Sequence, residues 1–209
     1  MNEIGRGAQY KVRSVGTERV RKIPLTTQES EAVIASWYAP NAAPQEELRV
    51  ASVYVAQSQK TCAIVQTACA KHHNLSALFA HPRFEEAGIY TQDRVTIVAE
   101  ALQNASHKQA CTLVDQYISL TLELWRYGLS ERVFNFTVNN GISKSGGIVL
   151  VDFGEITTDK AKVLRALTTQ RWLRAYSYHS LDSKLKAYYE QSMRQHLTPD
   201  ALERLWLTV

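Results

Sequence analysis

"LVDFGEIT", residues 150–157, is the stretch of sequence that decides the fold. The hydrophobic run 148–151 is typical of a buried strand, and it ends at Asp152. An aromatic residue, Gly154 and a second acid follow directly. An acid that ends a buried strand, with a glycine two residues later, indicates either a turn or a site for a metal ion and phosphate.

Composition limits what surrounds this stretch. The chain has 209 residues, of which 45% are hydrophobic, and a net charge of +4. This length allows one good core or two small lobes. The mild positive charge permits a nucleotide or a nucleic acid as a ligand and does not argue strongly for either. No early apolar block resembles a signal peptide, and no window is apolar enough to span a bilayer, so we expect a cytoplasmic protein without membrane contact.

Hydrophobic periodicity predicts the elements that precede residues 150–157. Residues 88–102 alternate and are rich in β-branched side chains, which indicates two short strands or one bent strand. A turn at Gly16-Thr17 joins the first two strands, and Gly128 closes the last helix. The remaining predicted elements are strands over 9–15 and 18–25 and helices over 27–38, 45–73 and 107–128.

Around the opening stretch itself, residues 133–138 and 146–153 read as a hairpin-like pair, with a turn at Asn139-Asn140-Gly141. Two helices follow, over 159–176 and 182–195. A last short helix begins at Thr198-Pro199, where threonine suits the N-cap and proline the first helical position. The order predicts an α+β fold with a sheet-rich start and a helical end.

Four chemically distinctive pieces lie along this order. A G-x-G precedes the first predicted strand, a lysine lies on the next strand, an asparagine precedes a turn, and an acid ends the buried strand. They are Gly5 and Gly7 in "IGRGAQYKV", Lys22 in "VRKI", Asn135 in "NFTV", and Asp152-Phe153-Gly154 in "LVDFGE".

In this order the pieces resemble the Gly-rich loop, strand-three lysine, catalytic-loop asparagine and D-F-G motif of the protein-kinase-like superfamily. The resemblance covers roughly residues 1–155 and includes a His81-Pro82 turn before the fourth strand. It implies a compact two-lobed fold. Residues 1–103 would form a small β-rich N-lobe with a long helix, and residues 104–209 a reduced helical C-lobe.

The resemblance also implies ATP and Mg²⁺ as cofactors. Glycine amides approach phosphates closely, a strand lysine neutralises them, and a carboxylate beside an amide oxygen suits a hard Mg²⁺ ion. Asn135 and Asp152, on adjacent predicted strands, would hold the metal. Lys22 would act in catalysis. The nucleotide-binding residues implied are Gly5, Gly7, Val12, Lys22, Glu100 and Leu102.

The catalytic loop departs from the family pattern. Ser130 stands five residues before Asn135, where the family has an aspartate, and no H-R-D is present. A serine hydroxyl is not a base of suitable pKa near pH 7. Glu131 would replace the aspartate only if the loop were re-registered by one residue, and Arg132 falls where the family often has a phosphate-contacting lysine.

The carboxylate partner of Lys22 is open between two acids. The family holds this lysine with a helix glutamate, and residues 48–84 contain no acid. Glu47 opens the long predicted helix and is favoured slightly, with Glu31 as the alternative. An acid near a helix N-terminus also interacts with the helix dipole, which explains either residue without a lysine partner.

The chain after Gly154 is short and lacks the family's A-P-E, so it offers no platform for a peptide substrate. Its basic and aromatic residues permit phosphate-bearing partners. Their helical spacing favours packing instead, for Trp172, Tyr176, Leu185, Tyr188 and Tyr189.

Three functions therefore stay open. The first is a pseudokinase or regulatory binding module, with an unknown protein or small-molecule partner. The second is an active, atypical phosphotransferase, and the third and remoter is a basic nucleic-acid-binding protein. The first two require Lys22, Asn135 and Asp152 to converge on one pocket beneath Gly5–Gly7.

Overall fold

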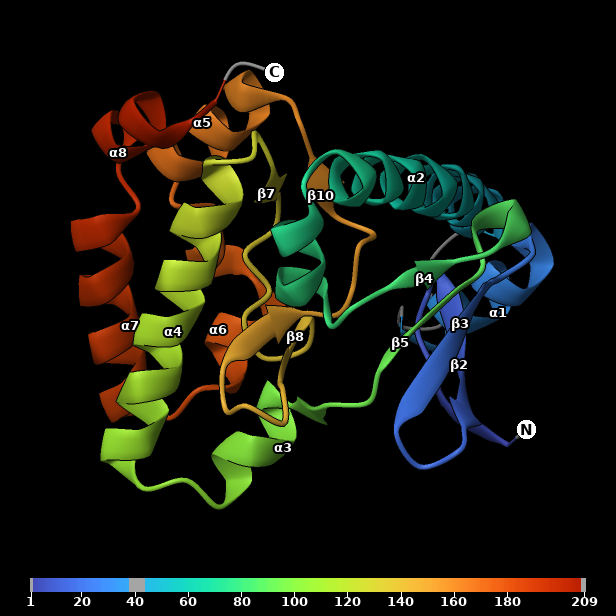
Figure 1. The fold of residues 1–209 in the computed structure, drawn as a ribbon, viewed down its shortest axis with the longest axis horizontal. Coiled ribbons are helices and arrows are strands. Elements are labelled where there is room, and N and C mark those ends of the chain that lie inside the picture. Colours follow the sequence, from blue (N-terminus) through green and yellow to red (C-terminus); the bar gives the residue numbers. More distant parts are fainter. Residues whose placement is uncertain (1, 38–43, 208–209) are drawn as a thin grey trace.

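A computed structural model describes residues 2–37 and 44–207, and the surroundings of side chains for residues 2–36 and 50–207. The described part is a mixed α+β structure with small antiparallel sheets, as the sequence predicts. The N-terminal strands lie at the right of Figure 1 and the C-terminal helices at the left, with a second small sheet between them.

The N-terminal sheet has five antiparallel strands in the order β1-β2-β3-β5-β4. The predicted strands over 9–15 and 18–25 are confirmed, and Gly16 has a left-handed φ of 65° in their turn. Val12 lies opposite Lys22 in the register, so the two side chains share one face of the sheet. The strands are β1 (Glu3–Arg6), β2 (Tyr10–Val15), β3 (Arg19–Pro24), β4 (Arg83–Phe84) and β5 (Tyr90–Asp93).

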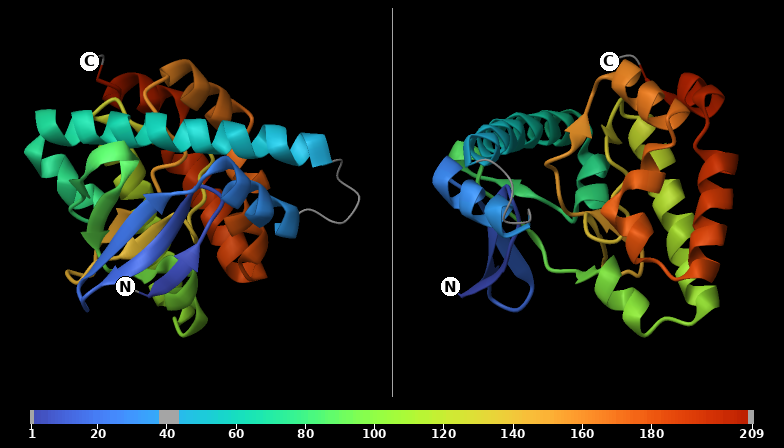
Figure 2. Two further views of the ribbon diagram at one scale, coloured as in Figure 1. Left: turned by 90° about the vertical axis from the view of Figure 1, so that its right-hand side faces the viewer. Right: turned by 180° about the vertical axis from the view of Figure 1, so that it is seen from behind.

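Two helices, α1 (Thr27–Trp37) and α2 (Pro44–Lys71), separate β3 from β4. Figure 2 shows α2 running past the first sheet toward the C-terminal part of the molecule. Cys62 and Val65, three residues apart on α2, are buried in the main core. At the other end of α2, Ala51 packs with residues of α1 and of the loop after β1.

The chain passes out of the first sheet after β5. β6 (Thr96–Ile97) pairs with a strand of the second sheet, and α3 (Val98–Gln103) follows directly. Two short strands are therefore confirmed within 88–102, but the end of that segment is helical, because alanine, glutamate and leucine favour a helix there. Short 3-10 helices, η1 (His73–Phe79) and η2 (Glu86–Gly88), flank β4.

The second sheet has the order β6-β8-β9, with β8 (Asn140–Ile142) and β9 (Ile148–Leu150) forming its hairpin. The predicted turn at 139–141 is wrong, and so is the predicted strand over 133–138, which is a loop. Gly141 lies inside β8. Position 141 requires a glycine, because a Cβ there would come within 2.2 Å of Val95. The turn lies instead at 143–147, where Gly146 has a φ of 85°.

The C-terminal helices pack around α4 (His107–Trp125), which contacts α7 and α8. A capping box at Ser106 begins α4, and Gly128, with a φ of 65°, follows its end as predicted. β7 (Ser130–Glu131) and β10 (Ile156–Thr157) form a separate antiparallel pair. The other elements are α5 (Lys160–Thr168), η3 (Arg171–Arg174), α6 (Tyr176–Ser180), α7 (Ser183–His196) and α8 (Pro199–Leu205).

The predicted helix over 159–176 is broken. Gln170 takes a left-handed φ of 46°, which ends α5 and turns the chain so that Trp172 enters the core. The helix predicted over 182–195 and the short helix capped by Thr198 are confirmed.

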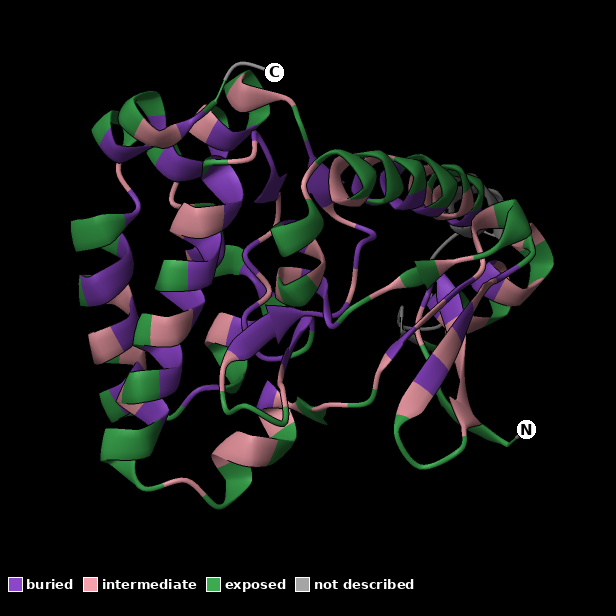
Figure 3. Cartoon of the chain, viewed as in Figure 1, coloured by how far each residue is buried: buried purple, intermediate pink, exposed green. Residues whose placement is uncertain are grey.

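Buried residues gather where α4 meets the second sheet, and exposed residues line the outer side of α2 (Figure 3). Of the aromatic and apolar tail residues predicted to pack, Trp172, Leu185 and Tyr189 are buried, and Tyr188 is partly buried against the core. Tyr176 is 69% exposed, so the packing prediction is wrong for that residue. Among the described helices, none is both long enough and apolar enough to cross a membrane.

Candidate functional site

A cleft of about 1320 Å³ lies between the N-terminal sheet and the loops beside β8 and β9. Leu102, one of the residues expected to bind a nucleotide, is not among those that line it and packs against the core from α3. The residues expected at a nucleotide and metal site that do line the cleft are Gly5, Gly7, Val12, Lys22, Glu100, Asn135 and Asp152.

Lys22 projects from β3 into this cleft and is only 7% exposed. Its Nζ donates a hydrogen bond to the carbonyl oxygen of Val151 at 2.6 Å. Burial lowers the pKa of Lys22, and the neighbouring charge of Asp152 opposes that shift. The lysine and the acid that lie 130 positions apart therefore share one electrostatic environment.

No ion pair joins Lys22 to a carboxylate among the side chains that the structure describes. Glu31 lies on α1 and does not line the cleft. Glu47 lies in the first turns of α2, and its side chain falls outside the described residues. The choice between the two acids stays a prediction.

Asp152 follows β9 and begins a tight turn. Its Oδ1 accepts a hydrogen bond from the backbone N–H of Gly154 at 3.0 Å, and Asp152 faces the cleft. Gly154 does not have a left-handed φ, so an unusual backbone angle does not explain this glycine. The side chain of Gln9, from the loop after β1, occupies the space beside it. The sequence suggested a turn or a site at Asp152, and the structure has the turn at the edge of the cleft.

Asn135 lines the cleft, but its amide oxygen has other partners. Oδ1 accepts hydrogen bonds from the backbone N–H of Ser177 at 3.1 Å and from Ser177 Oγ at 2.6 Å. An amide oxygen has two lone pairs, so both acceptor positions are used. Neither Asn135 nor Asp152 lies on a strand, and the prediction that they occupy adjacent strands is wrong.

Asn139, which the sequence indicates only as a turn residue, is bonded through its backbone to Asp152. Its carbonyl oxygen accepts the backbone N–H groups of Val151 at 2.8 Å and Asp152 at 3.2 Å. Its Nδ2 donates to Glu131 at 2.7 Å, and Asn139 lines the cleft. Among the described residues no hydrogen bond to its Oδ1 is found. Placing the hairpin at 140–150 would have identified it, because Asn139 is the last residue before β8.

Glu131 is buried behind the cleft and is not among its lining residues. Its Oε1 accepts hydrogen bonds from the backbone N–H of Asn135 and from Asn139 Nδ2, both at 2.7 Å, and its Oε2 accepts one from Tyr117 at 3.3 Å. Burial raises the pKa of Glu131 to about 7, although these hydrogen bonds lower it. Glu131 therefore does not reach the cleft surface, and its role as a base stays a prediction.

Ser130, which the sequence resemblance aligns with a catalytic aspartate, is also a core residue. Its Oγ accepts a hydrogen bond from Trp125 Nε1 at 3.1 Å and donates to the carbonyl oxygen of Glu131 at 3.2 Å. Its fully buried side chain has a structural role in joining β7 to the end of α4.

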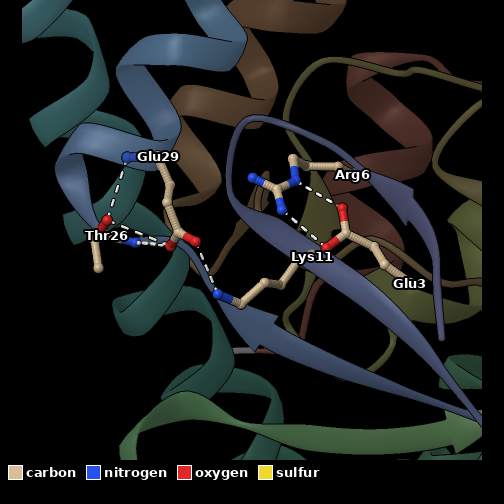
Figure 4. Close-up of polar contacts among 5 residues, drawn as sticks. All are labelled: Glu3, Arg6, Lys11, Thr26 and Glu29. Atoms are coloured by element: carbon tan, nitrogen blue, oxygen red, sulfur yellow. Dashed lines mark hydrogen bonds and ion pairs between the residues drawn. The ribbon is translucent and has the colours of Figure 1, made fainter. Parts of the chain in front are cut away.

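Two cations near the loop after β1 are already paired (Figure 4). Arg6 binds Glu3 through Nε at 2.7 Å, and Lys11 binds Glu29 at 2.8 Å. The hydrogen bond from Lys11, helped by the backbone of Thr26, lowers the pKa of Glu29 to about 2. Among the described residues that line the cleft, Lys22 is the buried cation.

The few oxygen donors that line the cleft suit Mg²⁺, which needs few protein ligands, better than they suit a metal ion held by several side chains. The described residues contain no group of three or more His, Cys, Asp or Glu side chains that could hold a metal ion. Mg²⁺ is ordinarily held by one or two carboxylates together with substrate phosphates. Asp152 Oδ2 and Asn139 Oδ1 are oxygen donors of that kind.

No protein-family model matches the chain, and the search of curated proteins found no significant match.

Proposed function

We propose that the chain is a kinase-like nucleotide-binding protein that takes ATP with Mg²⁺ in the cleft. One observation carries the proposal: the buried Lys22 lies near the charge of the partly buried Asp152, in a cleft that Gly5 and Gly7 also line. Burying an ammonium group is costly unless an anion compensates for it. The phosphates of a nucleotide are anions of the required charge and reach.

Each group has a stated role in this proposal. Lys22 neutralises the phosphates as a point charge, and Gly5 and Gly7, which have no Cβ, let the phosphates come close to the backbone. The N–H of Gly7 itself donates to the carbonyl oxygen of Tyr10 at 2.9 Å. Asp152 and Asn139 would hold the Mg²⁺ ion, which supplies further neutralisation of phosphate charge when bound. Asn135, whose amide oxygen binds Ser177, is replaced by Asn139 in this role.

The proposed architecture is two-lobed and kinase-like. The strand order of the first sheet, the helices between β3 and β4, and the cleft between the two parts of the chain support it. Because Ser130 and Glu131 are both buried, neither offers a base to a ligand in the cleft. A pseudokinase or regulatory binding module is therefore the form of the proposal that we favour.

Thermal unfolding of the full chain with and without Mg-ATP tests the proposal. ATP at a hundred times its dissociation constant should raise the free energy of unfolding by about 2.7 kcal/mol. Asp152→Ala should reduce this gain, and Glu86→Ala, which removes an exposed acid outside the cleft, should not. Absence of any ATP-dependent shift in the wild-type protein would contradict a nucleotide site.

A second candidate, an active atypical phosphotransferase, is favoured by the size of the cleft. Small-molecule sites usually enclose about 300–1,000 Å³, and this cleft, at about 1320 Å³, has room for an acceptor beside the nucleotide. Phosphoryl transfer depends mainly on positioning and charge neutralisation, so a missing base need not abolish it. Transfer of labelled phosphate that disappears in Asp152→Ala would establish this activity.

A further inference from the structure

The segment from Arg171 to Ser177 alternates between anchored and exposed residues along one wall of the cleft. Trp172, Ala175 and Ser177 are buried, and Arg171 and Arg174 are exposed. The two arginines and Tyr176 all line the cleft.

The buried residues fix this segment to the loop that precedes β8. The ring of Trp172 meets Phe134 edge-on, with centroids 5.8 Å apart. Ser177 Oγ donates to Asn135 Oδ1 at 2.6 Å and accepts the backbone N–H of Thr137 at 2.8 Å. The backbone that carries the two arginines is therefore held in place before any ligand arrives, which reduces the entropy lost on binding.

The two arginines have no carboxylate partner among the described residues. Glu155, an acid on the same part of the cleft wall, is bound by Arg132 through Nε at 3.0 Å and Nη2 at 2.5 Å. Burial raises the pKa of Glu155, the hydrogen bond and charge of Arg132 oppose that shift, and Arg171 opposes it only slightly. Two guanidinium groups thus face the cleft with their charge uncompensated by a salt bridge.

Tyr176 adds an aromatic surface to the same wall. It is one of the few large hydrophobic side chains that the structure exposes, although its neighbours in sequence are buried. An exposed ring beside unpaired arginines suits a ligand that has both an apolar body and an anionic group.

We infer that Arg171, Arg174 and Tyr176 form a second ligand site in the cleft, for a small aromatic or apolar molecule that carries a phosphomonoester. Guanidinium groups bind phosphate oxygens through paired, charge-assisted hydrogen bonds. This inference rests on the proposed function in one respect: it assumes that a nucleotide occupies the part of the cleft around Lys22. Because the arginines line a concave cleft, a small molecule fits them better than an extended nucleic acid.

Titration calorimetry of the full chain with phenyl phosphate tests the second site. We expect the Arg171→Gln/Arg174→Gln double variant to bind phenyl phosphate about tenfold more weakly or worse than the wild type. Arg204→Gln, which removes an exposed arginine of α8 outside the cleft, should leave the affinity unchanged. Equal affinity in the double variant and the wild type, or no binding to the wild type, overturns the inference.

Parallel titrations with Mg-ATP separate this inference from the proposed function. The double variant should keep its affinity for Mg-ATP, and Lys22→Met should keep its affinity for phenyl phosphate. Phenyl phosphate binding without Mg-ATP binding would refute the nucleotide site and leave the second site standing. Loss of phenyl phosphate binding in Lys22→Met would place the probe in the nucleotide site and refute the second site.

A phosphomonoester can come from a soluble metabolite or from a lipid headgroup. We expect no sedimentation of the protein with vesicles of phosphatidylcholine and phosphatidic acid. Sedimentation that the arginine double variant abolishes would overturn the assignment to a small soluble molecule.

Discussion

Gln9 fills the space in which residue 154 would carry a side chain. A Cβ built on Gly154 would lie 1.5 Å from Gln9 Oε1, and Gln9 Nε2 donates to the carbonyl oxygen of Gly154 at 3.4 Å. Gln9 is only 7% exposed. The loop after β1 is thus joined to the turn at Asp152, and the need for glycine at position 154 comes from a residue 145 positions away.

This contact predicts that the stability lost when position 154 gains a side chain depends on whether Gln9 is present. Gly154→Ala should lower the free energy of unfolding by roughly 1–3 kcal/mol, because the new methyl group overlaps Gln9. In a Gln9→Ala background the same substitution should cost clearly less, since the backbone of Gly154 itself accepts alanine. Urea denaturation of the two single variants and the double variant measures the coupling. Equal costs in both backgrounds would contradict the contact.

The raised pKa of Glu131 should make the stability of the protein depend on pH. An unfolded glutamate releases its proton near its ordinary pKa of 4.5, and the folded protein retains that proton until a pH of about 7. The free energy of unfolding should therefore fall as pH rises from about 4.5 to 7, by on the order of 3 kcal/mol, and not fall further from this group above pH 7.

Glu131→Gln should remove this fall in stability. A glutamine Oε1 still accepts from Asn135 and Asn139, and its amide can donate to the Tyr117 hydroxyl. We expect the variant to match the wild type near pH 4.5 and to exceed its stability at pH 8, as measured by urea denaturation at both pH values. A wild-type protein that gains stability from pH 5 to 7, with the gain lost in the variant, would show that the ionised carboxylate is the favoured form.

Substitution of Asn139 should weaken Mg²⁺ binding, and substitution of Asn135 should not. Asn139→Ala should raise the Mg²⁺ concentration needed for half-maximal stabilisation by ATP by about tenfold, because an oxygen ligand is lost. Asn135→Ala should lower stability by about 1–3 kcal/mol, since Ser177 loses its acceptor, and leave that Mg²⁺ midpoint unchanged. Thermal unfolding across a Mg²⁺ series at fixed ATP provides both values. The reverse pattern would return the metal role to Asn135.

Lys22 should contribute more to ligand binding than to folding. Lys22→Met replaces the desolvated ammonium group with an apolar side chain of similar length. The carbonyl oxygen of Val151 then keeps a hydrogen bond from Gln92 at 3.4 Å. We expect stability within about 1 kcal/mol of the wild type. A hundredfold loss of affinity would cut the gain from ATP, at a hundred times the wild-type dissociation constant, from about 2.7 to about 0.4 kcal/mol.

Lys11→Met is the matched control for that experiment. Lys11 lies on the neighbouring strand, pairs with Glu29 and does not line the cleft. Its variant should keep the full response to Mg-ATP. An equal loss of response in the two lysine variants would point to a general effect of charge rather than to a site at Lys22.

Local sequence determined much of the secondary structure. The strands around Gly16, the helix capped at Ser106, and the short helix that begins at Thr198-Pro199 follow from periodicity and capping residues a few positions apart. The hairpin before Asp152 was misplaced because an Asn-Gly pair is typical of a turn. Gly141 is needed instead for the close approach of Val95, a contact that no local pattern contains.

The sequence by itself therefore determined the α+β class, most helices and the residue types on which the proposed nucleotide and metal site depends. Only the tertiary structure decided that Ser177 binds the amide oxygen of Asn135, whereas among the described residues no hydrogen bond reaches that of Asn139. It also decided that Glu131 is buried and that Arg171 and Arg174 line the cleft. The physical reason is range. Periodicity and capping act over one or two turns of chain, whereas hydrogen-bond partners, burial and charge depend on residues that folding brings together from distant positions.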